Sequence, residues 1–569
     1  MIRKKIDSGA RASARRTSGK GGKPVVDWKG KFDRIWCISY TGYPERRKPL
    51  ERELDRVGIL GSGVLEWHYT FKSIFDNILF DVTKRLKTNN CEDVGSLACS
   101  LAHYHCIKSS YGLGDERCLI MEDDIRFLKD VGEVCDIVDG LPDNADIVLF
   151  DHMWNAAEHH DHDEFVRNPT GIYERVGKHY RRFGMLLGGS CYSLSRKAMK
   201  TMVGMYETVF EAADVYTARL TEKSGLVRLC SEPRLAFQVS YPKSNNTRLR
   251  WNSDIMDMYR RNGLDFSRYA DNDDGFPHHV SVSEPGAQAP CPPDNDDGLP
   301  HHDGFIPSFN VVTERPKTCK IPWRDKFDRI WCVAFTGYRD RIPPLVDELW
   351  RVGIIDSGIF EWQFTYPTCF NDMMYDVTKA IGCNEVDSKR VLSSVFGHYN
   401  CVKASLELGD RRILVVEDDV RFLKDLDKVA DTVSAIRDDS DVILFDYFGV
   451  WHGNREESRK FFLEQKNDRV DGHFSRFHTM YSAACYSVNR KAMSNVIRRC
   501  ESKLYAFDWY LSDLAGETDL VRHFSTEQMA CQLPPVNCSS NLDTNYGDGS
   551  TKAMTEFVGT DFSLFNITR

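Results

Sequence analysis

Residues 122–130, EDDIRFLKD, decide how this chain is organised, because they return as EDDVRFLKD at residues 417–425, 295 positions later. An apolar run precedes each copy, CLIM at 118–121 and ILVV at 413–416. Short aliphatic runs of this kind are typical of buried β-strands. Three carboxylates at the end of a buried strand repel one another and lose solvation, so they need a neutralising partner. A divalent cation would be such a partner, because hard ions prefer carboxylate oxygens.

Backbone geometry divides the three carboxylates of each copy between two directions. In extended backbone, residues i and i+2 face the same way, so Glu122 and Asp124 are predicted to share one metal ion while Asp123 faces elsewhere. Glu417 and Asp419 form the matching pair in the second copy. The alternative is an acidic strand end followed by a helix that aspartates cap. The occurrence of two copies in matching surroundings favours a metal or phosphate site.

The repeat extends far beyond the acidic triplets. KFDRIWC at 31–37 returns at 326–332, and CYS at 191–193 returns at 485–487, 294 positions later. A period of this length indicates two copies of one domain rather than a solenoid, whose repeats are much shorter. We predict four segments, namely a basic disordered tail (1–27), a first domain (28–262), a linker rich in Asp, Pro, Gly and His (263–322) and a second domain (323–569). The linker is expected to be flexible, and the alternative for its Asp and His residues is loose metal binding.

Within each copy, strand-like and helix-like stretches alternate. In the first copy, the pattern predicts strands at 34–39, 64–69 and 146–150, and helices at 44–57, 94–111 and 128–138. This alternation indicates an α/β sheet with helices on both faces. Ligands of such sheets gather beyond the carboxyl ends of the strands, which is where the acidic triplet falls.

Composition and charge narrow the class of protein. The formal net charge of −9 argues against nucleic acid as a partner. No stretch approaches the roughly 18 apolar residues that span a bilayer, and the N-terminus lacks the apolar core of a secretory signal. The 18 cysteines are therefore expected to be reduced thiols in a cytoplasmic protein. The basic tail is expected to be solvated, and the alternative is an arm that makes peripheral contact with an anionic membrane.

An ordered series of motifs runs through both units. The first unit has RR at 46–47, LAH at 101–103, LIMEDD at 119–124 and CYSLSRKA at 191–198; the second has FGH at 396–398, VVEDD at 415–419 and CYSVNRKA at 485–492. This series resembles glycosyltransferase family 25, which includes bacterial lipooligosaccharide β-galactosyltransferases and procollagen galactosyltransferases. The resemblance covers nearly all of both units and neither the tail nor the linker. The sequence departs from the pattern at Ile342, which replaces Arg47, and at Ala102 and Gly397, where the family often has Ser.

The resemblance implies two tandem GT-A-like domains, each Rossmann-like with a mostly parallel sheet. It also implies a UDP-sugar donor (commonly UDP-galactose), a divalent ion (Mn²⁺ or Mg²⁺), inversion at the anomeric carbon, and an acceptor hydroxyl on a glycan or a hydroxylated protein. The chemistry agrees, because cleavage of a sugar–phosphate bond places charge on the departing diphosphate, which a divalent ion stabilises as a Lewis acid. Inversion then needs a carboxylate or imidazole to take the proton of the acceptor.

Further residues are predicted to bind the sugar donor because they lie near the ends of strands and helices. The alternatives are an exposed helix-start arginine and a satisfied structural histidine. The predicted donor-binding residues are Arg46, Arg341, His103, His398, Asp123, Asp418, Asp151 and Asp446.

Asp214 and Asp508 fall where GT-A enzymes often carry the acceptor-activating base, so we predict that they are catalytic. The alternative is a carboxylate that stabilises a helix N-terminus. The matched His179 and His473 are weaker candidates for the acceptor side. Gln238 and Gln532 end the last matched strand and are expected to be structural.

Both triplets are intact, so the sequence predicts two active sugar transferases in one chain. One alternative is a catalytic unit joined to a silent acceptor-binding unit. Another is a metal-dependent phosphoesterase built on the same carboxylates, which is disfavoured because the several His and Asp ligands of a two-metal site are missing.

Overall fold

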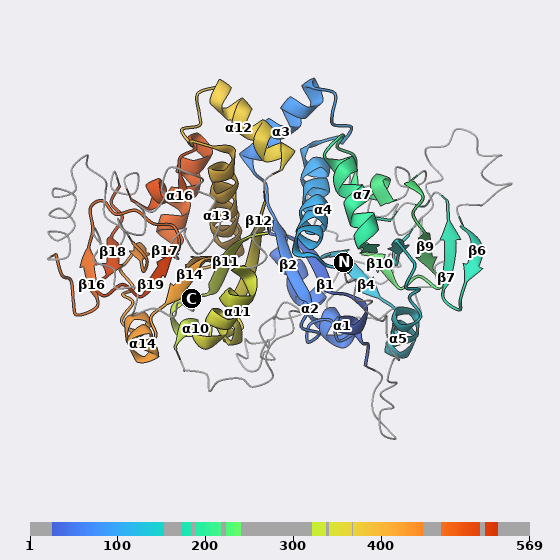
Figure 1. Ribbon diagram of the computed structural model, residues 1–569, viewed down its shortest axis with the longest axis horizontal. Coiled ribbons are helices and arrows are strands. Elements are labelled where there is room, and N and C mark those ends of the chain that lie inside the picture. Colours follow the sequence, from blue (N-terminus) through green and yellow to red (C-terminus); the bar gives the residue numbers. More distant parts are fainter. Residues whose placement is uncertain are drawn as a thin grey trace, which may run out of the picture.

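The computed structural model describes residues 25–152, 172–184, 186, 188–217, 224–239, 321–336, 341–366, 368–447, 468–512 and 518–532. They form two α/β units that lie against each other (Figure 1). Most of the predicted tail and linker lies outside the described residues, so those two segments stay predictions. The matched residues Val26 and Ile321 are both buried, which places the start of the folded part slightly before the predicted boundaries at 28 and 323.

The first unit alternates strands and helices along the chain. Its strands are β1 (Arg34–Tyr40), β2 (Leu65–Thr70), β3 (Arg117–Glu122), β4 (Ile125–Phe127), β5 (Ile147–Leu149), β6 (Ile172–Val176), β7 (Tyr180–Phe183), β8 (Cys191–Ser195), β9 (Arg228–Ser231) and β10 (Ala236–Gln238). Its helices are α1 (Trp28–Lys31), α2 (Arg47–Arg56), α3 (Ile74–Arg85), α4 (Val94–Leu113), α5 (Val131–Asp139), α7 (Arg196–Tyr206) and α8 (Ala213–Val215), with a 3-10 turn η1 (Pro44–Arg46) before α2.

The main sheet of the first unit has the strand order β2-β1-β3-β8-β5-β9-β7-β6. β1 runs parallel to β2 and β3, whereas β8 lies antiparallel between β3 and β5. The sheet is therefore mixed, and its parallel part β2-β1-β3 is the part nearest the second unit (Figure 1). The α/β class is confirmed, with more antiparallel pairing than the expected mostly parallel sheet.

The second unit repeats this arrangement, with the strand order β12-β11-β13-β17-β15-β18-β16. Its strands are β11 (Arg329–Phe335), β12 (Phe360–Thr365), β13 (Arg412–Glu417), β14 (Val420–Phe422), β15 (Val442–Leu444), β16 (Phe474–Arg476), β17 (Cys485–Asn489), β18 (Arg522–Ser525) and β19 (Ala530–Gln532). Its helices are α10 (Trp323–Lys326), α11 (Ile342–Arg351), α12 (Cys369–Ala380), α13 (Lys389–Leu408), α14 (Leu426–Ser434), α16 (Arg490–Ser502) and α17 (Phe507–Leu511), with a 3-10 turn η6 (Ile355–Ser357).

Most elements lie where the sequence placed them, and the exception has a local cause. The strands predicted at 34–39, 64–69 and 146–150 and the helices predicted at 44–57 and 94–111 are confirmed to within a few residues. The helix predicted at 128–138 begins only at Val131, because β4 occupies the residues after the acidic triplet. Asp130 then caps α5 by accepting a hydrogen bond from the backbone N–H of Gly132 at 2.7 Å.

Two short antiparallel strand pairs, one in each unit, lie directly after the acidic triplets. β10 pairs antiparallel with β4, which sets Gln238 opposite Ile125, directly after the acidic triplet. β19 pairs with β14 in the same way, so Gln532 lies opposite Val420. Pairing across more than 100 residues therefore brings a distant amide to each carboxylate cluster.

The junction between the units follows an approximate two-fold relation. β2 and β12 lie beside each other at its centre, and α3 and α12 cross over them (Figure 1). Tyr69 packs edge-on against Trp331 with ring centroids 5.7 Å apart, and the matched Phe364 packs edge-on against Trp36 at 5.9 Å. One continuous cluster of buried apolar residues contains members of both units. The two units therefore share a hydrophobic core.

The shared core predicts that the two units unfold together. Tyr69→Ala and Phe364→Ala should each lower the free energy of unfolding by about 3–5 kcal/mol, as expected for removing a buried aromatic ring, and each should shift one single transition. Urea unfolding followed by tryptophan fluorescence and circular dichroism measures both. Leu86→Ala, at an exposed position just after α3, is the control and should change stability by less than about 0.5 kcal/mol. Two separate transitions, one per unit, would contradict the shared core.

None of the helices in the described parts of the chain is both long and apolar enough to cross a membrane. The described cysteine side chains are free thiols, and nearly all of them are buried.

Candidate active site

The first carboxylate cluster lies at the carboxyl end of β3. Gln238 donates from Nε2 to Glu122 Oε2 at 3.2 Å and to Asp124 Oδ2 at 3.3 Å. The two carboxylates therefore face the same side, as the i, i+2 spacing predicts. The structural role expected for Gln238 is too narrow, because its amide orients both predicted metal ligands.

Asp123 points away from this pair and is held by the first strand and by Arg46. Its Oδ2 accepts from the backbone N–H of Tyr40 at 2.8 Å, and its Oδ1 accepts from Arg46 Nη1 at 3.1 Å. The same Nη1 lies 3.4 Å from Asp124 Oδ2, and the guanidinium stacks over the ring of Tyr43 at 4.3 Å. Arg46 thus places a positive charge between two acidic residues. Each oxygen of Asp123 thus accepts one hydrogen bond that fixes the carboxylate, and its contact with the donor stays a prediction.

His103 lies behind Glu122 rather than beside a ligand. It is fully buried on α4; its Nε2 is 3.1 Å from Glu122 Oε1, and its Nδ1 is 2.9 Å from the hydroxyl of Tyr192 on β8. Both ring nitrogens are therefore engaged, and the predicted donor contact gives way to a role in fixing Glu122. Cys99, His103 and Glu122 together present three ligand atoms within 4.8 Å of one another. The second unit has Ser394 in place of Cys99, so the two units do not share this alternative ligand set.

The second unit reproduces the cluster atom for atom. Gln532 Nε2 lies 3.3 Å from both Glu417 Oε2 and Asp419 Oδ2. Arg341 donates to Asp418 at 3.0 Å and lies 3.4 Å from Asp419. The remaining matched contacts are the backbone N–H of Phe335 to Asp418 at 2.7 Å, His398 to Glu417 at 2.9 Å and His398 to the hydroxyl of Tyr486 at 3.1 Å.

One carboxylate oxygen in each cluster is buried with no hydrogen-bond partner among the described residues. These atoms are Asp124 Oδ1 and Asp419 Oδ1. Burial raises the pKa of both carboxyl groups, and the neighbouring acidic side chains add to the rise. A buried, partnerless carboxylate oxygen is costly unless a cation completes it. An all-oxygen set from Glu122 and Asp124, or from Glu417 and Asp419, fits a hard divalent ion such as Mn²⁺ or Mg²⁺.

The predicted base of the first unit lies beside this cluster. Asp214 is on α8, and burial raises the pKa of its carboxyl, with the charge of Glu122 adding to the rise and His103 opposing it. Gly189 permits this approach, because a Cβ at that position would lie 3.2 Å from the backbone nitrogen of Asp214. In the second unit, Asp508 is on α17, and its neighbour Phe507 stacks on His398 with ring centroids 4.7 Å apart. Both predicted bases are thus carried on elements that reach the carboxylate clusters.

Asp151 and Asp446 follow β5 and β15 and are almost completely buried. Asp151 Oδ2 accepts from the hydroxyl of Ser190, and Asp446 accepts from Ser482 at 2.9 Å and from Gln528 at 2.8 Å. These bonds fix both carboxylates within the protein, and their contact with the donor stays a prediction.

His179 lies at the turn between β6 and β7 and packs toward Gly140 at the end of α5. The described contacts of His179 and His473 do not bring either residue to a carboxylate cluster. Arg47, by contrast, is explained by the junction, because it donates to the hydroxyl of Tyr69. Its replacement by Ile342 in the second unit therefore leaves the site unaffected.

Part of the first unit is similar in sequence to a known protein family. Residues 66–217 match the family model described as glycosyltransferase family 25 (LPS biosynthesis protein), a range that includes the first acidic triplet, His103, Tyr192 and Asp214. No curated protein matches the chain.

Two solved structures are similar at low identity. Mouse xyloside xylosyltransferase 1 in its apo form is 10% identical, with a TM-score of 0.20, covering 40% of this chain and 92% of that one. The apo-form glycosyltransferase GlyE of Streptococcus pneumoniae TIGR4 is 9% identical, with a TM-score of 0.22, covering 68% of this chain and 90% of that one. Both TM-scores are too low for either likeness to bear on the function. The family match is what decides: this chain is a glycosyltransferase that carries a glycosyltransferase family 25 domain in its first unit.

Proposed function

We propose that both units transfer a hexose, galactose in the first instance, from a UDP-sugar to a hydroxyl group with inversion. The observation that carries this proposal is the pair of matched clusters, each with one buried carboxylate oxygen that lacks a partner among the described residues. A silent second unit would need neither the glutamine bridge nor the arginine contact, yet both are present there. The acceptor would be a glycan, such as the lipopolysaccharide named in the family description, or a hydroxylated protein.

Each residue of the first cluster has a defined task in this proposal. Glu122 and Asp124 would hold Mn²⁺ or Mg²⁺, and Gln238 keeps their oxygens turned to the same side. The ion would serve as a Lewis acid toward the departing diphosphate. Arg46 offsets the negative charge of the cluster in the absence of a donor and is placed to meet the donor's phosphates.

Asp214 completes the reaction. As the bond between the acceptor oxygen and the anomeric carbon forms and the bond from that carbon to the diphosphate oxygen breaks, the proton of the acceptor hydroxyl passes to Asp214. Its raised pKa makes it a stronger base than an exposed aspartate. Asp508 takes the same role in the second unit.

A thermal-shift screen of the full chain tests donor and metal together. UDP-galactose with Mn²⁺ is expected to raise the melting temperature by mass action, with about 2.7 kcal/mol of stabilisation at a ligand concentration of 100 times Kd. UDP-glucose and UDP-N-acetylhexosamines serve as competing donors, and UDP-galactose without metal is the matched control. An equal shift with and without metal, or no shift with any nucleotide sugar, would overturn the proposal.

Cytoplasmic location also stays a proposal, as does membrane contact through the basic tail, most of which lies outside the described residues.

A further inference from the structure

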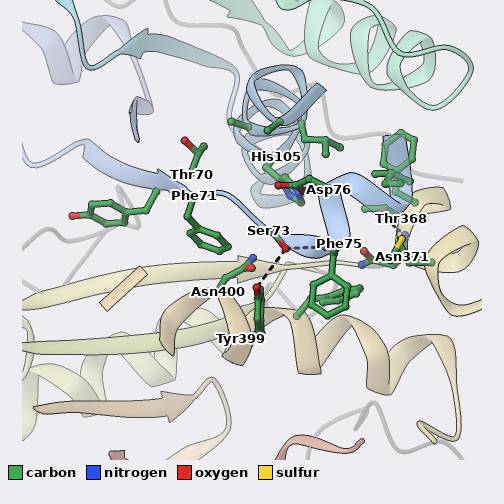
Figure 2. Close-up of a pocket in the computed structure, with 18 of the residues that line it drawn as sticks. Thr70, Phe71, Ser73, Phe75, Asp76, His105, Thr368, Asn371, Tyr399 and Asn400 are labelled. Atoms are coloured by element: carbon green, nitrogen blue, oxygen red, sulfur yellow. Dashed lines mark hydrogen bonds between the residues drawn. The ribbon is translucent and has the colours of Figure 1, made fainter. Parts of the chain in front are cut away.

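A cavity of about 140 Å³ lies at the junction between the two units (Figure 2), and no residue of either carboxylate cluster lines it. The start of α3 and one face of α4 line it from the first unit, and the start of α12 and one face of α13 line it from the second. Six pairs of lining residues are 295 positions apart, so the cavity straddles the approximate two-fold axis. The pairs are Ser73 and Thr368, Phe75 and Phe370, Asp76 and Asn371, Leu79 and Met374, Leu101 and Phe396, and His105 and Asn400.

Aromatic rings form the walls of this junction cavity. Phe75 packs edge-on against Tyr399 with ring centroids 5.2 Å apart, and Phe71 packs against the same ring at 6.0 Å. Figure 2 shows Phe71 and Phe75 approaching from the first unit and Tyr399 from α13. Ser73 lies between them, with its hydroxyl 3.4 Å from that of Tyr399. The cavity therefore has apolar faces that would accept a flat or CH-rich surface.

Several polar side chains that line the cavity have hydrogen-bonding capacity that the described part of the protein leaves unfilled. Within the described part of the chain, the His68 ring and the Asn400 amide make no hydrogen bond, and the Asp76 carboxylate accepts a hydrogen bond from the backbone of Ser73. These groups include both donors and acceptors, since an amide and a neutral imidazole each supply one of each kind. Polar groups left without partners at a half-buried site favour a ligand that carries several hydroxyl groups.

The cavity carries no positive charge. Neither lysine nor arginine lines it. Burial lowers the pKa of His68 to about 3 and that of His105 to about 4, so both imidazoles are neutral near pH 7. Phosphate, nucleotides and acidic sugars need a cationic partner when they are buried. The lining therefore excludes the UDP-sugar donor and any other anion.

We propose that the junction cavity binds one neutral sugar ring. The size suits a single ring, since pockets for drug-sized ligands begin at about 300 Å³. The faces of the ring would lie against Phe71, Phe75 and Tyr399, and its hydroxyls would meet His68, Asp76 and Asn400. Both units contribute to this site, so it exists only in the paired arrangement.

The position of the cavity links it to the first active site. α4 presents Cys99 and His103 to Glu122 on one side and Ala98 and His105 to the cavity on the other. The two sites are thus separated by one helix, roughly 10 Å across. The role of the bound ring as part of an acceptor glycan rests on the proposed function, whereas binding of the ring itself does not.

Saturation-transfer NMR and isothermal titration calorimetry of the full chain with methyl β-galactoside and methyl β-glucoside test the proposal. We expect saturable binding in the millimolar range, where Kd of 1 mM corresponds to about −4.1 kcal/mol. His68→Gln and Asp76→Asn install the residues that the chain itself carries at the matched positions 363 and 371, so both are expected to fold. Each changes which atoms donate and accept hydrogen bonds at its position, so each should weaken binding by about fivefold or more, the effect of one mismatched hydrogen bond, and Ala98→Phe should abolish it by filling the space.

The controls separate this site from the active site. Asp81→Asn, an exposed carboxylate on the same helix as Asp76, should leave glycoside binding unchanged. The shift in melting temperature with UDP-galactose and Mn²⁺ should persist in all of these variants, so loss of glycoside binding and failure of the proposed function are distinguishable. Absence of saturable binding, binding that His68→Gln and Asp76→Asn leave unaltered, or preferential binding of tetramethylammonium to the aromatic walls would each overturn the sugar site.

Discussion

Sugar transfer is expected to disappear when Asp124 and Asp419 are both replaced by alanine. Each change removes the buried oxygen that lacks a protein partner, together with one ligand of the predicted ion. Loss of ion binding removes several kcal/mol of stabilisation of the departing charge, which corresponds to a decrease in kcat of about 10² or more. The single variants should each retain the share of transfer that the other unit supplies. Release of UDP from UDP-galactose in the presence of acceptor measures the effect.

Asp130→Asn and Asp425→Asn are the matched controls. These residues end the same repeated stretch but cap α5 and α14 rather than face the cluster, and asparagine is an equally good cap. Both variants should transfer sugar at the wild-type rate. If one single variant, Asp124→Ala or Asp419→Ala, removed all transfer while the other had no effect, only one unit would be catalytic. If the double variant kept full activity, the metal-dependent mechanism would be wrong.

The largest effect on kcat without loss of donor binding is expected at the proposed bases. Asp214→Asn, measured with the second unit silenced by Asp419→Ala, should lower kcat about 10²–10⁴-fold, the usual contribution of a general base. Asp508→Asn, measured with the first unit silenced by Asp124→Ala, should do the same. Asparagine keeps the shape of the side chain but cannot take the proton. The increase in melting temperature with donor and metal should be retained, because neither residue belongs to the predicted ion ligands.

Glu211→Gln is the control for Asp214, because it removes a carboxylate from the segment just before α8, where Glu211 accepts a hydrogen bond from Asn90 instead of facing the cluster. It should leave kcat unchanged. If Asp214→Asn altered KM for the donor and left kcat intact, Asp214 would be a donor-positioning residue and the base would have to be sought elsewhere. Azide or formate rescue of Asp214→Ala would support the assignment, since a small external base would then take the proton.

The sequence predicts the local parts of the site because they depend on neighbouring residues. The i, i+2 spacing predicts that Glu122 and Asp124 face the same side, and Gln238, bonded to both, confirms that their carboxylates converge, although Asp123 and Asp124 lie in the turn between β3 and β4. The strands and the long helix α4 follow from hydrophobic runs and from Asp93, which caps α4 by accepting from Ser96. The break between strand and helix at 125–130 is harder to foresee, because β4 is only three residues long.

The contacts that cross long stretches of chain are the ones that sequence patterns miss. Gln238 reaches the acidic pair through the pairing of two three-residue strands, which carry no periodic signal. Tyr192 looks like an ordinary core tyrosine until its hydroxyl is seen at His103. The junction was equally hidden, since Tyr69 and Phe364 sit on strands whose buried faces resemble any interior face.

Because the two units belong to one chain, the residues on either side of the two-fold axis between them can evolve independently. In a dimer of identical subunits, any substitution near the symmetry axis appears twice and faces its own copy. Here it appears once, so matched positions on the two sides of the axis can differ, as the carboxylate of Asp76 differs from the carboxamide of Asn371 and the imidazole of His105 from the carboxamide of Asn400. Covalent linkage also fixes the ratio of the two halves at one to one and keeps each at a high effective concentration for the other. Two linked units can thereby form a junction cavity with different residues on its two sides, which a dimer of identical subunits could not form.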